Sequence, residues 1–169
     1  MATIAAAQVT REPHAPDSFE RILSVGAIIL FAFVVAAVAK GASEWRMITP
    51  LVWIHLIAMT FAVGLTPIML LRPRGTALHR TLGRVWAVAM LVAAVISFQI
   101  RDINHGGFSF IHILSAYTAI QVPILVWSAR THNVKRHRRS VRAMVTGALL
   151  VAGFFTFPFN RLLGSWLFG

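Results

Sequence analysis

The stretch ILSVGAIILFAFVVAAVA, Ile22–Ala39, decides the fold, because it runs for eighteen positions without a charged residue. A helix needs about 20 apolar residues to cross the hydrocarbon core of a bilayer. Four more apolar runs follow it in the sequence: Pro50–Leu71, Val85–Ile100, Phe108–Ala129 and Val145–Phe159, the last extending towards Phe168. The first, second and fourth runs are long enough alone, and the third and fifth become so if the basic segment before each supplies an opening turn. Because a backbone in lipid must satisfy its own hydrogen bonds, the sequence predicts an all-α protein with five transmembrane helices.

The composition agrees with a membrane protein. Of the 169 residues, 57% are hydrophobic and only 12% are charged, whereas about a quarter of the residues of a soluble domain are charged. The polar start MATIAAAQVTREPHAPDSFE precedes the apolar run, and no small-residue cleavage site follows that run, which favours a retained helix over a signal peptide. We therefore expect a tail over residues 1–21 and one transmembrane domain over 22–169, whose first helix covers 22–40.

The charges alternate between the predicted connections. A net charge of +11 would suggest nucleic acid in a soluble protein, but the cations gather in two loops: Arg72, Arg74, Arg80 and Arg84, then Arg130, Lys135, Arg136, Arg138, Arg139 and Arg142. The other connections hold only Lys40, Glu44 and Arg46, or Arg101 and Asp102. This positive-inside pattern predicts a multi-pass protein of a bacterial inner membrane, with a cytoplasmic N-terminus, an outer C-terminus and no nucleic-acid partner.

The chain also repeats itself. WIHL at 53–56 matches FIHI at 110–113 with an offset of 57, and HRTLGR at 79–84 matches HRRSVR at 137–142 with an offset of 58. Repeats over 49–101 and 108–168 would enter the membrane from the same side, related by a pseudo-two-fold axis along its normal. Helices two to five would then form a duplicated four-helix bundle. Chance similarity between two basic loops is the alternative, since arginines gather in such loops in any case.

Four histidines occupy matched positions in the two repeats. His55 and His112 would lie near the outer surface, and His79 and His137 would open helices three and five on the cytoplasmic side. Imidazole in a membrane is costly unless it is paired or ligated. Two neutral imidazoles from facing helices are the axial ligands that a b-type haem requires. We therefore expect these four histidines to be iron ligands of one or two haems.

Arginines near the histidines would suit the anionic propionates of a haem. The predicted partners are Arg80, Arg84, Arg138 and Arg142 around the inner pair, and Arg101 near the outer pair. The chain has no cysteine, which excludes disulfides, thiolate metal sites and covalent c-type haem.

Other interpretations of the histidines remain open. They could bridge helices or touch lipid phosphate, hold a single haem or a bare metal ion, or relay protons. His14, His105 and His132 lie in the tail and in loops and are poor ligand candidates. The sequence shows no Ser/His/Asp set, carboxylate pair or phosphate-binding glycine loop, so hydrolytic and kinase chemistry have no support.

Two resemblances add to this interpretation. RPRGTALHRTLGRVWAVAM at 72–90 and SFQIRDINHGGFSFIHILS at 97–115 resemble a bacterial family of small membrane proteins of unknown function, over roughly residues 50–161. That family implies a multi-helix inner-membrane protein. The order of the four histidines, with HRTLG, also resembles transmembrane di-haem cytochrome b proteins, which implies a haem ligand on each of four helices. The second copy, HRRSV at 137–141, departs from the HRTLG pattern, because Val141 stands where that pattern has glycine.

The functional hypothesis is a membrane-embedded b-type cytochrome-like electron-transfer protein or redox-complex subunit. Its expected partners are the lipid bilayer, quinone and other redox subunits, in a homo- or hetero-oligomer. The alternative is a non-catalytic membrane subunit, scaffold or small transporter with structural histidines.

Overall fold

A computed structural model of the chain describes residues 16–100 and 110–169, and the elements in these ranges are all helices. They are α1 (Ser18–Lys40), the 3₁₀ helix η1 (Gly41–Met47), α2 (Pro50–Leu71), α3 (Ala77–Ser97), α4 (Phe110–Arg130), α5 (Val134–Met144), the π-helix η3 (Val145–Val151), α6 (Ala152–Phe154) and α7 (Leu162–Phe168). The predicted all-α class is confirmed for this part of the chain.

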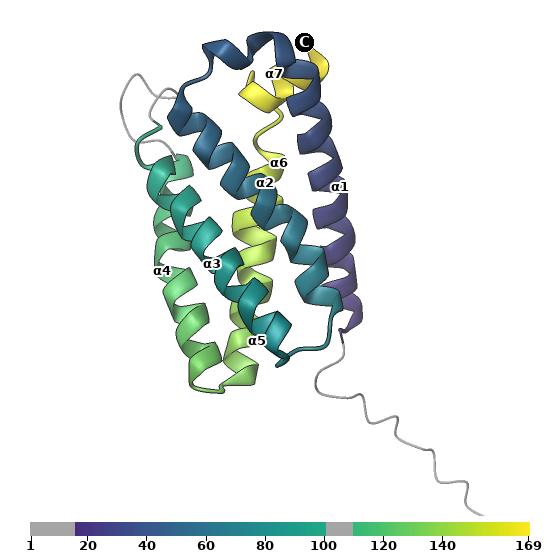
Figure 1. Ribbon diagram of the computed structural model, residues 1–169, viewed down its shortest axis with the longest axis vertical. Coiled ribbons are helices and arrows are strands. Elements are labelled where there is room, and N and C mark those ends of the chain that lie inside the picture. Colours follow the sequence, from purple (N-terminus) through teal and green to yellow (C-terminus); the bar gives the residue numbers. More distant parts are fainter. Residues whose placement is uncertain (1–15, 101–109) are drawn as a thin grey trace, which may run out of the picture.

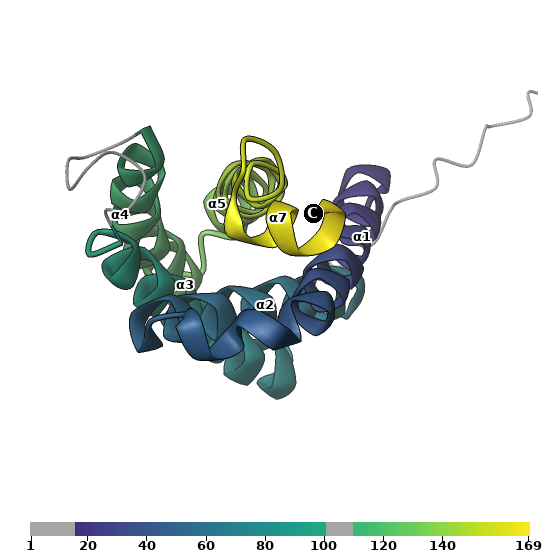
Figure 2. The same ribbon diagram turned by 90° about the horizontal axis from the view of Figure 1, so that it is seen from above.

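The helices form an arc with one column inside it. Helix α1 packs against α2, α2 against α3, and α3 against α4. Seen from above, these four curve around α5 and η3, which pack against α4 and α1 (Figure 2). The loops rich in arginine lie at the end of the molecule where α1 begins, which we call the basic end, and α7 lies across the opposite end (Figure 1).

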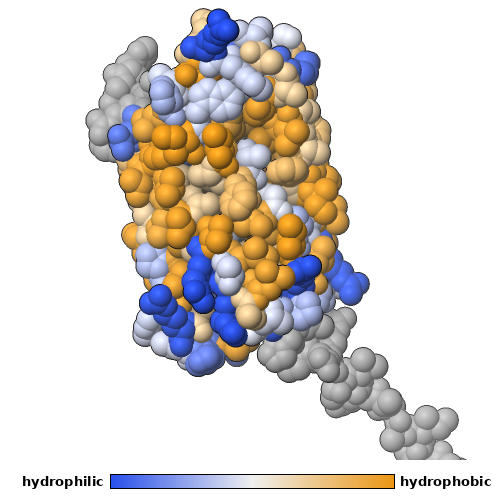
Figure 3. Space-filling model, viewed as in Figure 1, coloured by the Kyte–Doolittle hydropathy of each residue, from blue (hydrophilic) through white to orange (hydrophobic). Residues whose placement is uncertain are grey.

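Four helical segments are long and apolar enough to cross a membrane: Ser18–Met47, Pro50–Leu71, Ala77–Ser97 and His112–Arg130. In the view of Figure 3, apolar side chains cover the middle of the molecule and hydrophilic ones gather towards its ends. Both observations suggest a membrane protein. The fifth apolar run differs from its expected extent, because its helix ends at Phe154 and left-handed Phe159 and Asn160 turn the chain into α7. The count of five and the duplicated bundle stay predictions.

Side-chain caps begin the helices that follow the two basic loops. The hydroxyl of Thr76 accepts a hydrogen bond from the backbone nitrogen of His79 at 3.1 Å, and the side chain of Asn133 accepts one from Arg136 at 3.0 Å. Such caps satisfy backbone N–H groups that have no partner inside the helix. The two caps are 57 residues apart, which is also the offset of the matched IH pairs.

Polar contacts join neighbouring helices inside the fold. The buried indole of Trp86 donates to the hydroxyl of Thr66 at 3.0 Å and links α3 to α2. At the opposite end, a Cβ on Gly41 would overlap the ring of Trp166. Glycine therefore permits the close approach of α7, whose Trp166 also donates to Glu44 at 2.9 Å. The first contact holds α3 against α2, and the other two hold α7 against η1 at the end opposite the basic loops.

A carboxylate at the start of α1 gathers three arginines at the basic end. Glu20 is only 1% exposed; Arg138 binds it through two nitrogens at 2.8 and 3.0 Å, and Arg142 and Arg74 bind it as well. Asp17, the N-cap of α1, exchanges capping-box bonds with Glu20 at 3.0 and 3.1 Å and pairs with Arg138 and Arg142. This Asp17–Glu20 cluster joins α1, the α2–α3 loop and α5.

The variant Glu20→Gln should destabilise the fold, because the carboxylate of Asp17 would then be the one negative charge left in the cluster beside three arginines. Breaking a buried charge network costs about 3–5 kcal/mol, and partial exposure of two of the arginines reduces this to about 2–3 kcal/mol. Denaturant unfolding in detergent micelles measures the change. The matched control is Glu44→Gln, which removes one negative charge but keeps an acceptor for Trp166. Equal losses in the two variants would contradict the role of the cluster.

The stability that Asp17 contributes should depend on pH. Burial acts to raise the pKa of Asp17, but hydrogen bonds from the backbone of Glu20 and the side chain of Arg142 outweigh it and hold the pKa below its ordinary value of 3.8. A carboxyl with a depressed folded-state pKa stabilises the fold above its unfolded pKa, and this contribution is lost as the pH falls through the folded value.

The wild type should therefore have a higher thermal unfolding midpoint than Asp17→Asn at neutral pH, by a constant amount down to about pH 5. The gap should then shrink as the pH falls below about 4. Unfolding of both proteins in detergent, followed by circular dichroism across this pH range, checks the expectation. A gap that stays unchanged at the acidic end would show that the Asp17 carboxylate is not stabilised in this way.

Candidate histidine site at the basic end

His79 and His137 both lie at the basic end, on α3 and α5 (Figure 1). His79 is the third residue of α3 and His137 the fourth of α5, each inside the first turns after a capping residue. The two imidazoles lie within electrostatic range of each other and of the guanidinium of Arg74. The helices that carry them do not pack closely against each other, so a shared ligand between the two rings stays a prediction.

The hydrogen bonds of this pair leave ring nitrogens available. The Nδ1 atom of His137 lies 3.2 Å from the carbonyl oxygen of Leu125 on α4; a carbonyl only accepts, so Nδ1 carries the hydrogen and Nε2 keeps its lone pair. A backbone carbonyl commonly orients a metal-ligating histidine in this way. The Nδ1 atom of His79 is buried without a hydrogen-bond partner among the described residues, a costly state for a polar atom.

Small residues lie near the histidines on both helical columns. One turn after His79, a Cβ on Gly83 would touch only the terminal methyl of Met69, at 3.4 Å, and a Cβ on Gly147 of η3 would meet nothing within 4 Å. Helix α5 packs closely against α4, and α3 is not among its close neighbours. Because Met69 belongs to α2, Gly83 faces α2 and does not border the space between α3 and α5. Helix α5 continues into the π-helix η3. π-Helical turns are frequent at functional sites.

The outer pair is arranged differently. The Nδ1 atom of His55 on α2 lies 2.9 Å from the carbonyl oxygen of Ala93 on α3. His112 on α4 is 5% exposed, and its ring packs against Phe98 at the end of α3 with 6.2 Å between centroids. Helix α3 lies between α2 and α4 and packs against both, and α2 and α4 do not pack closely against each other. The structure therefore places the outer histidines on either side of α3.

The predicted propionate partners have different surroundings. Arg138 and Arg142 pair with Asp17 and Glu20. Arg80 is exposed and donates to the carbonyl of Gly75 at 2.7 Å.

Arg84 follows His79 by five residues, so at 3.6 residues per turn it lies roughly 140° around α3 from the histidine. Arg101, with His14 and His105, lies outside the described residues.

Sequence reasoning missed Asp17, Glu20 and Arg74 as part of this site. The available signal was the pattern Asp-x-x-Glu directly before an apolar run, which is a capping box. The chain has only five acidic residues, and Asp17 and Glu20 are two of them. Few other side chains could therefore supply the negative charge that pairs with the basic loops. Arg74 carries no local signal that separates it from the other loop arginines.

The sequence leaves a bare metal ion open as an alternative to haem. Within residues 16–100 and 110–169, no group of three or more His, Asp or Glu side chains is placed to hold a metal ion. A six-coordinate haem needs only two protein ligands, because the macrocycle supplies four nitrogens. The four histidines do not line the groove between α1 and α2 or the groove between α3 and α4. The candidate site is thus an internal pair and not an open pocket.

Comparisons of the chain with known protein families, with curated proteins and with solved structures gave no match. The functional proposal accordingly rests on the placement of the chain's own residues.

Proposed function

We propose that the chain is a membrane-embedded b-type cytochrome-like electron-transfer protein, or such a subunit of a redox complex, with His79 and His137 as the axial ligands of one haem. The observation that carries the proposal is the state of these two imidazoles at one end of the fold: the ring of His137 is oriented by a backbone carbonyl, and His79 has a buried nitrogen without a partner among the described residues. Paired imidazoles from separate helices are the ligand set of bundle cytochromes.

The surrounding residues support this role. The Leu125 carbonyl holds the ring of His137, and the Thr76 cap fixes the backbone at His79. Arg80 directly follows His79 in the chain and could meet an anionic edge. A haem held there would carry one electron at a time through its iron.

The proposal includes an orientation in the membrane. We infer that the basic end faces the cytoplasm, in line with the positive-inside rule, and that the α5–η3–α6 column makes the fifth crossing of a bacterial inner membrane. The column runs from the basic end towards the end where α7 and the C-terminus lie (Figure 1). Electrons would pass between the haem and a quinone or another redox subunit. The equal spacing of the helix caps supports the duplication.

A second haem between His55 and His112 has weaker support, because α3 stands between the two helices that carry them. The alternative function is a non-catalytic membrane subunit, scaffold or small transporter. Its support is that His55 and His137 each donate to a backbone carbonyl of a neighbouring helix. Polar side chains inside membrane proteins often bridge helices in this manner.

Visible spectroscopy of the purified protein tests the haem. The wild type, purified from haem-supplied cells or reconstituted with hemin, should show the reduced-minus-oxidised bands of low-spin haem b. His79→Ala and His137→Ala should each abolish these bands, because six-coordination needs both rings. The matched control is His132→Ala, which removes an exposed histidine from the loop between α4 and α5 and should leave the spectrum unchanged.

Two outcomes would count against this assignment. A colourless wild-type protein that is folded and inserted would reject the cytochrome hypothesis and favour structural histidines. Bands that survive His79→Ala and His137→Ala but vanish in His55→Ala and His112→Ala would place the haem at the opposite end.

Reporter fusions test the inferred orientation. A reporter that is active only after export should be active when fused after Gly169 and inactive when inserted in the loop after Arg130, because the two positions lie at opposite ends of the molecule. A reporter that is active only in the cytoplasm should give the inverse result. Cytoplasmic activity after Gly169 would overturn the five-crossing topology.

A further inference from the structure

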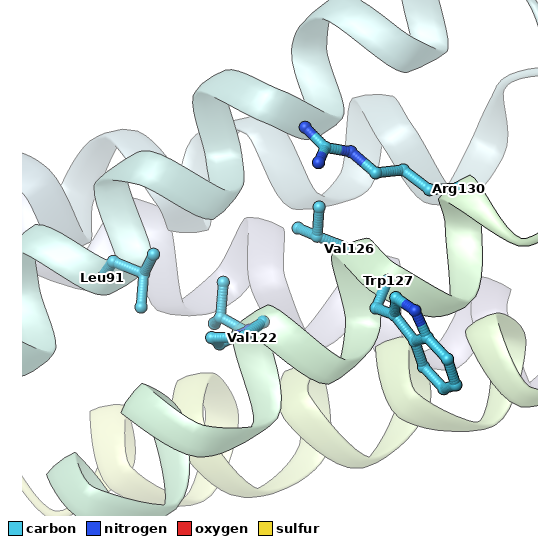
Figure 4. Close-up of a pocket in the computed structure, with 6 residues that line it drawn as sticks. Leu91, Val122, Val126, Trp127 and Arg130 are labelled. Carbon is cyan, nitrogen blue, oxygen red and sulfur yellow. The ribbon is translucent and has the colours of Figure 1, made fainter.

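A groove runs along the surface between α3 and α4 and ends at a cation. It has a volume of about 310 Å³ and is lined by Leu91, Val122, Pro123, Val126, Trp127 and Arg130. Figure 4 shows Val122 and Val126 following one another along α4 towards Arg130, with Leu91 on α3 facing them. The groove is therefore apolar along its length and charged at the basic end.

More cations surround the charged end of this groove. Arg84 precedes Leu91 by seven residues, which is close to two helical turns, so both lie on one face of α3. The guanidinium of Arg136 stacks over the ring of Trp127, 5.2 Å from its centroid. Arg84, Arg130 and Arg136 are exposed. In the described part of the chain, each ion pair involves Arg74, Arg138 or Arg142 instead.

The geometry points to a binding site for one anionic phospholipid in this groove, with an acyl chain along Leu91 and Val126 and the phosphate between Arg84 and Arg130. Basic pockets between transmembrane helices bind anionic headgroups in this way. Trp127 is 56% exposed beside the cations, at the level where tryptophans meet the headgroups of a bilayer. An acidic soluble partner would leave the apolar walls without a role. The proposal is independent of the haem.

Lipid titration of the detergent-solubilised protein, followed by native mass spectrometry, tests the site. The probe is phosphatidylglycerol, and phosphatidylcholine with the same chains is the comparison. The wild type should retain phosphatidylglycerol preferentially. The double variant Arg84→Gln/Arg130→Gln should weaken this binding by about fivefold for each arginine removed. The matched control is Arg72→Gln/Arg139→Gln, which removes two exposed cations of the basic end that lie outside the groove and should weaken binding less than twofold.

A second variant tests the apolar part of the site. Val126→Phe fills the groove without changing the charge, and it should also weaken phosphatidylglycerol binding while the helical circular dichroism signal is unchanged. Added inorganic phosphate should compete poorly, because it has no acyl chain.

Equal losses in the two arginine double variants would show diffuse attraction to the basic end and overturn the proposal. Unchanged phosphatidylglycerol binding in Val126→Phe, or strong competition by inorganic phosphate, would show that the site recognises only the anion and not the acyl chain. Either result would also overturn the proposal.

Discussion

The basic end of this protein depends on one buried carboxylate, that of Glu20. Helix α5 and the α2–α3 loop both carry an excess of arginine, and two such segments repel each other where water is partly excluded. Glu20 receives Arg74 from the loop and Arg138 and Arg142 from α5, and the adjacent N-terminal N–H groups of α1 favour its negative charge. Because Arg138 directly follows His137, this pairing also sets where the histidine lies. The candidate site thus depends on α1, a helix that stands outside the predicted repeat.

Local pattern was sufficient to predict most of the helices. The apolar run Pro50–Leu71 coincides with α2, because proline opens it and a charged loop closes it. His79 and His137 lie at the same end of the fold (Figure 1) because each follows one of the two basic loops; their role as a ligand pair stays a prediction. Glu20 could not be found in this way, because its partners lie 54, 118 and 122 residues along the sequence. The π-helical turn of η3 and the left-handed Phe159 and Asn160 likewise depend on packing that no local pattern encodes.

The outer histidines lie on helices that α3 separates, and the reason is the asymmetry of the fold. A duplicated bundle would place α2 opposite α4 as it places α3 opposite α5. Instead α1 packs along α2, and the α5–η3 column packs against α4 and α1. Helix α3 therefore contacts both α2 and α4, so His55 and His112 reach its end from opposite sides. A helix added outside a repeat can thus shift one pair of matched residues.

The arginines of the basic end divide into two sets with different physical roles. Arg74, Arg138 and Arg142 are neutralised by Asp17 and Glu20, so they stabilise the fold and are poor partners for a further anion. Arg84, Arg130 and Arg136 are exposed and remain available to phosphate at the membrane surface. Helix α3 belongs to both regions, because it carries His79 on one side and Arg84 roughly 140° away. A lipid held between α3 and α4 would therefore also fix the position of α3, and with it the distance between His79 and His137.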